Sequence, residues 1–353
     1  MRSHLPTAVA FTIAVALVPV GTFAASPAAS GRAQASPAPP SPTVAGAAGS
    51  PAADAAARVE GVPAMGSVFL IIGENTQRSL ITPDHAPYLT GTIQPTAAWV
   101  NDYYALTDGS LANYIGLTSG QYLPCHAANA EPADCHQKVD NVFSQLDRAG
   151  LPWQEWMESA TNACDYRDSG ALWAKNLFVT HHDPAVYYDR VQGGLYDKAT
   201  APSAECLANV LSTGTTGPND TSALEAALAA GDIGRLVLII PNACEQGHDP
   251  CGRHDRIRQF DDFLARIVPQ IQASPAYGPD SVIMITWDEG GQPPLKDRFN
   301  IQLAVVGPRV KPGTYDGTVH FDHYSLLRTV EDGLGLPRLA GAGKSPVLGH
   351  IWR

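Results

Sequence analysis

Metal-ligating side chains follow three short apolar runs of this chain, directly after two of the runs and soon after the third. The pairs are Glu74-Asn75, His248-Asp249 and Asp288-Glu289, and they come after the runs 68–72, 236–240 and 282–286. Carboxylate, amide and imidazole donors of these kinds bind divalent cations in proteins. If the pairs meet, they form one metal-dependent catalytic crevice. The alternative is that acidic residues follow strands only because loops are polar. That explanation would be preferred for a single strand end, but it is the weaker one for three.

The three apolar runs predict the elements that would bring these side chains together. Each run is short and rich in β-branched residues, which is typical of a buried parallel strand. In open α/β sheets the active site lies beyond the carboxyl ends of such strands. The sequence therefore predicts an α/β fold whose site is built from distant parts of the chain.

Ser110 is the candidate nucleophile that such a crevice needs. Asp108-Gly109 is a turn signal, and an apolar-periodic run then continues to Gly120. This pattern predicts a helix that begins at Ser110, where the backbone N–H groups and the macrodipole favour a phosphate or an alkoxide. The alternative is that Ser110 only caps the helix, as serine often does.

Several histidines are placed where they could contact a substrate. His182 belongs to an adjacent pair before an Asp-Pro turn, and it could donate to an oxyanion or only cap the local backbone. His248 lies between Cys244 and Cys251, and a disulfide between them would hold that loop rigidly. His323 precedes an amphipathic run that predicts another helix.

Six cysteines lie beyond the N-terminal region, an even number that favours disulfides in an exported chain. Six cysteines allow about 15 pairings. Proximity in sequence favours Cys125–Cys135, Cys164–Cys206 and Cys244–Cys251. A zinc site is the alternative, and the lack of any Cys-x-x-Cys pair argues against it.

The N-terminal region predicts export. Residues 1–24 combine a basic start, an apolar stretch and a small-residue cleavage site, which is typical of a signal peptide, with an uncleaved anchor as the alternative. Residues 25–60 are mostly Ala, Pro and Ser and predict a disordered linker. The remainder, 61–353, fits one large domain, and no later run could span a bilayer. We therefore expect a secreted or cell-envelope-associated protein.

The formal net charge of −11 at pH 7, without a basic cluster, argues against a nucleic-acid partner. An anionic substrate would still need local positive charge. A bound metal ion supplies it without a basic surface.

In their order along the chain, these motifs resemble the bacterial phosphoesterase family. That family contains secreted acid phosphatases and phospholipases C and belongs to the alkaline phosphatase superfamily. The resemblance runs from about Val68 to Ile351 and is strongest to secreted mycobacterial acid phosphatases that act on phosphoinositides. It implies an alkaline-phosphatase-like α/β fold, with a mostly parallel central sheet and helices on both faces.

The resemblance also implies a nucleophile. The family pattern is Ser or Thr, then x-Pro-Asn, and this chain matches it at Ser110 and Asn113. Asn113 would orient the phosphate. The chain departs from the pattern at Ala112, where the family usually has Pro, and at Asp108, where it often has His.

These departures leave the hydroxyls of Thr118 and Ser119 as alternative nucleophiles. A sulfatase is disfavoured, because that pattern needs Cys or Ser followed by x-Pro-x-Arg, and Ser110 is followed by Leu-Ala-Asn-Tyr.

The remaining site residues are assigned from the same resemblance. The metal ligands would be Glu74, Asn75, Asp288 and Glu289, and His182 would contact the phosphate. The substrate, or a second metal, would be bound by His248, Asp249 and His323, with Asn75 also holding a phosphoryl oxygen.

The implied activity is metal-dependent hydrolysis of phosphate monoesters through a phosphoserine. Hard oxygen ligands are compatible with Mg²⁺, Ca²⁺, Mn²⁺ or Fe. The expected partner is a phosphorylated small molecule or a phospholipid head group. The alternatives are a phospholipase C that cleaves phosphodiesters and a non-catalytic envelope binding protein.

Overall fold

The computed structural model of the chain describes residues 61–122, 129–172, 175–194, 201–291, 297 and 299–353. The expected signal peptide (1–24), the expected linker (25–60) and Cys125 of the expected Cys125–Cys135 pair lie outside the described residues. In the part that is described, no helix is long and apolar enough to cross a bilayer.

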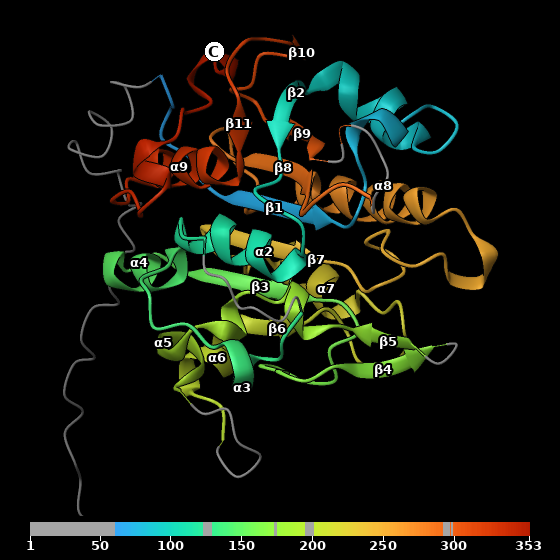
Figure 1. Cartoon of the computed structure of the whole chain (residues 1–353), viewed down its shortest axis with the longest axis vertical. Coiled ribbons are helices and arrows are strands. Elements are labelled where there is room, and N and C mark those ends of the chain that lie inside the picture. The colour runs from blue at the N-terminus through green and yellow to red at the C-terminus, as the bar shows by residue number, and fades with distance from the viewer. Residues whose placement is uncertain (1–60, 123–128, 173–174, 195–200, 292–296, 298) are drawn as a thin grey trace, which may run out of the picture. The chain divides into compact units, whose positions relative to one another are not determined.

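A nine-stranded sheet forms the centre of the described domain, in the order β10-β2-β9-β8-β1-β7-β3-β6 with β11 also paired to β2 (Figure 1). The strands are β1 (Val68–Gly73), β2 (Ala98–Tyr104), β3 (Trp153–Met157), β6 (Val210–Ser212), β7 (Leu236–Ile240), β8 (Val282–Trp287), β9 (Asn300–Val306), β10 (Gly313–Tyr315) and β11 (Phe321–Asp322). A separate antiparallel hairpin joins β4 (Ser169–Leu172) and β5 (Lys175–Phe178). Among the described strands of the large sheet only β9 pairs antiparallel, so the expected mostly parallel α/β fold is confirmed.

The register of β1 aligns the three predicted strands at one edge. β1 lies between β7 and β8, and all three predicted runs are fully buried strands. Gly73 at the end of β1 pairs with Trp287 at the end of β8. On the other side, Ile71 pairs with Ile239, one residue before the end of β7. The polar segments after these strands therefore emerge side by side.

Eight α-helices accompany this sheet in the described part of the chain. They are α2 (Ser110–Ser119), α3 (Pro132–Cys135), α4 (Val142–Ala149), α5 (Asp189–Gln192), α6 (Ala204–Asn209), α7 (Ser222–Ala230), α8 (Arg256–Ala273) and α9 (His323–Leu334). Helix α2 contacts α4 and α9, whereas α7 contacts α8. Figure 1 shows α2 in front of the sheet.

Helix α2 has the bounds that the sequence predicts. It begins at Ser110 and ends before Gly120, which adopts the left-handed conformation with φ 68°. Gly109 precedes it with φ 100°, a value that glycine adopts without a steric penalty. Because Gly109 has no side chain, no side-chain acceptor caps the first turn. The N–H groups of that turn therefore remain available.

Two of the three expected disulfides are confirmed, Cys164–Cys206 and Cys244–Cys251. The first joins the segment before β4 to α6, and the second closes the loop after β7 that contains His248 and Asp249. The helix predicted at the amphipathic run after His323 is α9, in which Asp322 and Ser325 form a reciprocal N-terminal capping box.

Candidate active site

Glu74 and Asp288 lie next to each other at the carboxyl edge of the sheet. The pairing of Gly73 with Trp287 brings the two following residues together, and the Asp288 N–H donates to the Gly73 carbonyl at 3.1 Å. Both side chains are buried, with relative exposures of 0% and 2%. Burial raises the pKa of both carboxyls, and the charge of Asp288 raises the pKa of Glu74 further. The pair is costly to ionise fully unless a cation offsets it.

Ser110 contacts this carboxylate pair. Its hydroxyl donates to Glu74 Oε2 at 3.2 Å. Ser110 is 4% exposed and occupies the first position of α2, where no side chain caps the helix. A nucleophilic oxygen, two carboxylates and free helix N–H groups therefore meet at one point.

Asn75 links the two carboxylates from the backbone side. Its N–H donates to Asp288 Oδ1 at 3.1 Å, and its Nδ2 donates to Glu74 Oε2 at 3.3 Å. Asn75 adopts φ 48°, which asparagine tolerates better than most residues. Its buried Oδ1 has no hydrogen-bond partner among the described residues. That oxygen is available to a ligand.

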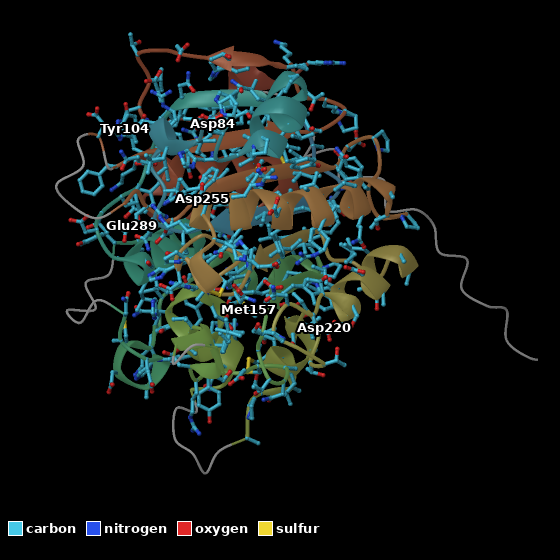
Figure 2. The ribbon with its side chains drawn as sticks, turned by 90° about the vertical axis from the view of Figure 1, so that its right-hand side faces the viewer. Asp84, Tyr104, Met157, Asp220, Asp255 and Glu289 are labelled. Atoms are coloured by element: carbon cyan, nitrogen blue, oxygen red, sulfur yellow. A yellow bond between two sulfur atoms is a disulfide. The ribbon has the colours of Figure 1, made fainter. Side chains whose placement is uncertain are left out.

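Glu289 contacts the loop that precedes the nucleophile. Its Oε2 accepts a hydrogen bond of 2.7 Å from the Gly109 N–H, so the end of β8 is tied to the start of α2. Figure 2 shows Glu289 on the same side of the molecule as Tyr104, the last residue of β2. The contact fixes the position of Ser110 relative to Asp288.

His182 approaches Glu74 from a third direction. It ends a 3₁₀ turn (Thr180–His182), and its Nε2 lies 3.4 Å from Glu74 Oε1. The Gln246 amide donates to Nδ1 at 2.8 Å, so the neutral ring carries its hydrogen on Nε2. Burial lowers the pKa of His182 well below its usual value, and the neighbouring His181 and His248 lower it further. His182 is thus a neutral donor beside the carboxylates.

Asn113 and His323 are buried close to the site, and the hydrogen bonds of both include backbone groups. Asn113 Oδ1 accepts from the Leu106 N–H at 2.9 Å, and its Nδ2 donates to the carbonyls of Thr107 and Gly109. His323 Nε2 donates to the Asp288 carbonyl at 2.6 Å. In this arrangement Asn113 fixes the loop before Ser110, and His323 fixes the loop after β8.

His248 and Asp249 lie further out. His248 is exposed, its Nδ1 is 3.1 Å from Asp249 Oδ1, and its ring centroid is 5.9 Å from that of His182. The disulfide-closed loop therefore places this pair beside His182 and outside the group formed by Glu74 and Ser110.

Three residues that the sequence reasoning missed complete the arrangement: Tyr103, Tyr114 and Gln246. The Tyr114 hydroxyl donates to Glu74 Oε1 at 2.8 Å, and its ring lies against His182. The Tyr103 hydroxyl is 2.8 Å from His323 Nδ1. Only Tyr114 had a signal in the sequence, because it follows Ser110 by four positions and so shares its helix face.

The donor set at this edge suits a hard cation. Asp288 Oδ2, like Asn75 Oδ1, is buried without a hydrogen-bond partner among the described residues. No group of three or more His, Cys, Asp or Glu side chains in that part of the chain is arranged to hold a metal ion. The set instead combines two carboxylates, an amide and the Ser110 hydroxyl, and oxygen donors of these types are the ligands that hard divalent cations prefer.

Comparison with known proteins matches the chain to the Phosphoesterase family over residues 81–337. A probable acid phosphatase of Kluyveromyces lactis is 25% identical over 294 residues, which are 81% of this chain and 62% of that protein. The chain thus spans less than two thirds of that relative. A phosphatidylinositol-3-phosphatase of Mycobacterium tuberculosis is 25% identical over 292 residues, which are 82% of this chain and 84% of that protein.

The fold also matches a solved structure. A protein of the alkaline phosphatase superfamily from Vibrio parahaemolyticus superposes with a TM-score of 0.54 at 10% identity, covering 83% of this chain and 77% of that one. The expected alkaline-phosphatase-like fold is therefore confirmed.

Proposed function

Since this chain belongs to the Phosphoesterase family, we propose that it hydrolyses phosphate monoesters through a phosphoserine formed on Ser110. The observation that carries the proposal is the hydrogen bond from the Ser110 hydroxyl to the buried carboxylate of Glu74, at the uncapped N-terminus of α2. The same N–H groups that leave this helix uncapped are suited to bind a phosphoryl oxygen.

The buried oxygens of Glu74, Asn75 and Asp288 would hold a divalent cation. The two adjacent carboxyls and the unpartnered Asn75 Oδ1 and Asp288 Oδ2 support this assignment. When bound, the cation would lower the pKa of the serine hydroxyl and offset the charge of the phosphoryl group. Oxygen ligands of this kind suit Mg²⁺, Ca²⁺, Mn²⁺ or Fe.

Ser110 then acts on the phosphorus atom. Its hydrogen is held at Glu74 Oε2, which leaves the lone pairs of Oγ free to attack. The serine oxygen–phosphorus bond forms as the ester oxygen leaves, and water hydrolyses the phosphoserine in a second step. Throughout both steps, the first-turn N–H groups of α2 stabilise charge on the phosphoryl oxygens.

His182 is proposed to donate to a phosphoryl oxygen. Its Nε2 carries the hydrogen, is buried and has no hydrogen-bond partner among the described residues. A neutral imidazole stabilises developing negative charge as a hydrogen-bond donor. The amide of Gln246 sets the tautomer that makes this possible.

Asn113, Glu289 and His323 are proposed to act mainly through other residues. Asn113 and Glu289 contact the loop before Ser110, and His323 contacts the Asp288 carbonyl. Small displacements of a nucleophile from its productive geometry reduce the rate strongly. We propose that His248 and Asp249, which lie beside His182, contact the part of the substrate beyond the phosphate.

For the substrate we propose a phosphoinositide head group, because the mycobacterial relative is a phosphatidylinositol-3-phosphatase. Export is proposed as well, since the disulfides Cys164–Cys206 and Cys244–Cys251 suit an oxidising compartment. Cleavage of phosphodiesters, as in a phospholipase C, remains the second candidate because the same groups can bind either ester.

A substrate panel with and without EDTA tests the proposal. The purified protein is assayed with p-nitrophenyl phosphate, phosphatidylinositol 3-phosphate and phosphatidylcholine. We expect inorganic phosphate from the two monoesters, loss of release with EDTA, and recovery when a divalent cation is added in excess. Release of phosphocholine from phosphatidylcholine would favour the phospholipase. Binding of phosphatidylinositol 3-phosphate without turnover of any substrate would favour a binding module.

A further inference from the structure

Arg256, the first residue of α8, bridges two of the loops that form the candidate active site. Its Nη1 donates to Thr76 Oγ1 at 3.0 Å, in the loop after β1, and to the Gly247 carbonyl at 2.8 Å, in the disulfide-closed loop after β7. The side chain is half-buried. Because one nitrogen donates both bonds, the two loops are held at a fixed separation.

Thr76 connects this bridge to the site carboxylates. The residue is 0% exposed, and its hydroxyl donates to the Glu74 carbonyl at 3.0 Å. A hydroxyl has one hydrogen to donate and accepts through its lone pairs, and Arg256 is the donor that Thr76 Oγ1 accepts from. The Thr76 N–H also donates to the Glu289 carbonyl at 3.0 Å. The guanidinium therefore acts on the turn that carries Glu74.

The second bond of Arg256 reaches the loop that carries Gln246. The Glu74 N–H donates to the Gln246 carbonyl at 2.8 Å, and the Gln246 side chain contacts His182. Gly247 adopts φ 88°, and a Cβ there would lie 3.0 Å from the Arg256 carbonyl, so this loop packs tightly on the start of α8. Arg256 thus closes a ring of hydrogen bonds that joins the loop of Glu74 to the loop behind His182.

Charge alone is the competing explanation for this residue. Burial lowers the pKa of Arg256, whereas the charges of Asp255 and Glu74 raise it, and an arginine stays protonated in a folded protein. Both acceptors of Nη1 are uncharged oxygens, so these two contacts are not ion pairs. The placement of one acceptor in each loop indicates a bridge and not only a counter-charge.

We propose that Arg256 is a positioning residue, which locks the loop after β1 to the loop after β7 and so aligns Glu74 with His182 around the reacting phosphoryl group. The role in catalysis rests on the proposed function, whereas the bridge between the loops does not.

Arg256→Met in the full chain tests the catalytic role. Methionine keeps an apolar stem of similar length and removes both donors and the charge. We expect kcat with p-nitrophenyl phosphate to fall about 100-fold, because a small displacement of reacting groups has this effect. KM should stay within about threefold, since Arg256 contacts loop atoms and not the substrate. An unchanged kcat, or a raised KM with kcat unchanged, would overturn the proposal.

Arg258→Met is the matched control. Arg258 lies in the same first turn of α8, is exposed, and donates from Nε to Asp262 Oδ1 at 2.9 Å. Its replacement removes the same charge from the same helix end without touching either loop. The kcat of this variant should equal that of wild type. A loss as large as that of Arg256→Met would mean that charge at the start of α8 matters and that the bridge does not.

Cation affinity separates positioning from charge by its sign. If Arg256 acted only through its charge, Arg256→Met would bind Mg²⁺ or Mn²⁺ more tightly, because a positive charge near Glu74 opposes a second cation. If Arg256 positions Glu74, affinity should fall, and we expect a fall of about tenfold. Calorimetric titration measures it without substrate. Tighter binding in Arg256→Met would contradict the positioning role.

Hydrogen exchange tests the bridge without activity or cation. The amides of Glu74 and Thr76, which donate to the Gln246 and Glu289 carbonyls, should lose protection in Arg256→Met. The amide of Ile71, inside β1, should keep its protection. Equal protection of the Glu74 and Thr76 amides in wild type and Arg256→Met overturns the bridge.

Thr76→Val supplies a second variant if Arg256→Met does not fold. It removes the acceptor of the guanidinium, and the Glu74 amide should again lose protection, whereas Thr76→Ser, which retains the hydroxyl, should keep it. Unchanged protection in Thr76→Val would also overturn the bridge. If wild type turns over no phosphate ester while these amides respond as expected, the bridge stands and the proposed function is what fails.

Discussion

The Ser110 hydroxyl donates a hydrogen bond of 3.2 Å to Glu74 Oε2, although the two residues are 36 positions apart in the sequence, one at the start of α2 and the other directly after β1. The contact depends on two features of the backbone. β1 ends at Gly73, directly before Glu74, and Gly109 lets the chain turn directly into the helix with φ 100°. The hydrogen bond places the Ser110 hydroxyl oxygen, the proposed nucleophile, against Glu74, the most deeply buried carboxylate of the candidate site.

Tyr114→Phe should weaken the site without unfolding the protein. The lost hydroxyl donates to Glu74 Oε1 at 2.8 Å and lowers the pKa of that carboxyl. We expect about a tenfold fall in divalent-cation affinity, or about 1.4 kcal/mol, as for one hydrogen bond to a charged group. Calorimetric titration with Mg²⁺ or Mn²⁺ measures it.

Tyr188→Phe is the matched control for that variant. Its hydroxyl is also buried, but it is bonded to Thr118 Oγ1 at 2.6 Å and not to a site carboxylate. Both variants should lose similar stability, and only Tyr114→Phe should lose cation affinity. Equal cation affinities in the two variants would show that Tyr114 plays no part in the site.

The two disulfides should separate activity from stability. Replacing Cys244 and Cys251 by Ser removes a link across seven positions, and replacing Cys164 and Cys206 removes one across 42. The chain-entropy relation gives losses of about 2 and about 4 kcal/mol in the free energy of unfolding. The first loop, however, contains Gln246, which contacts His182.

The Cys244/Cys251 variant should therefore lose more kcat, and the Cys164/Cys206 variant more thermal stability. Activity and melting temperature of both double variants test this ordering. The reverse order in activity would mean that the loop after β7 does not position His182.

Glu331→Gln should change how stability depends on pH. Burial raises the pKa of Glu331 to about 8, so the native state keeps a proton that the unfolded chain releases at about pH 4.3. The free energy of unfolding of wild type therefore falls as the pH rises from about 4.3 to about 8. Urea denaturation at pH 5, 7 and 9 should show the variant gaining on wild type by about 1 to 3 kcal/mol. Parallel pH profiles would contradict this.

The strand ends could be predicted because local patterns determine them. Buried parallel strands read as short β-branched runs, and the chemistry of Glu74 and Asp288 marks where these runs stop. Ser110 was predictable because a turn signal and an apolar period fix the start of α2. In each case the prediction needed only neighbouring residues and the rule that parallel strands share a carboxyl edge.

The contacts between elements that are distant in the sequence could not be predicted from such local patterns. The resemblance assigns Asn113 to the phosphate and His323 to the substrate or a second metal, and these assignments stay predictions. What the sequence did not indicate is that Asn113 bonds to backbone groups of the loop before Ser110 and that His323 bonds to the Asp288 carbonyl. A motif gives the identity of a residue, whereas the direction of its side chain depends on packing.

The alternative hydroxyls now serve as controls for the nucleophile. Ser119 Oγ donates to the Ile115 carbonyl at 2.7 Å, and Thr118 Oγ1 donates to the Tyr114 carbonyl at 2.7 Å. Both bond back to the helix, away from Glu74. Ser119→Ala should therefore keep near-normal turnover.

The most direct test of the phosphoserine mechanism is to trap the intermediate. Enzyme turning over a ³²P-labelled monoester is quenched in acid, digested, and the labelled peptide is mapped by mass spectrometry. We predict label on the peptide that contains Ser110. Ser110→Ala should lose this label and at least about three orders of magnitude in kcat, as for a nucleophile that acts as part of a unit. Near-normal turnover in Ser110→Ala, or label on Ser119 instead, would contradict the account.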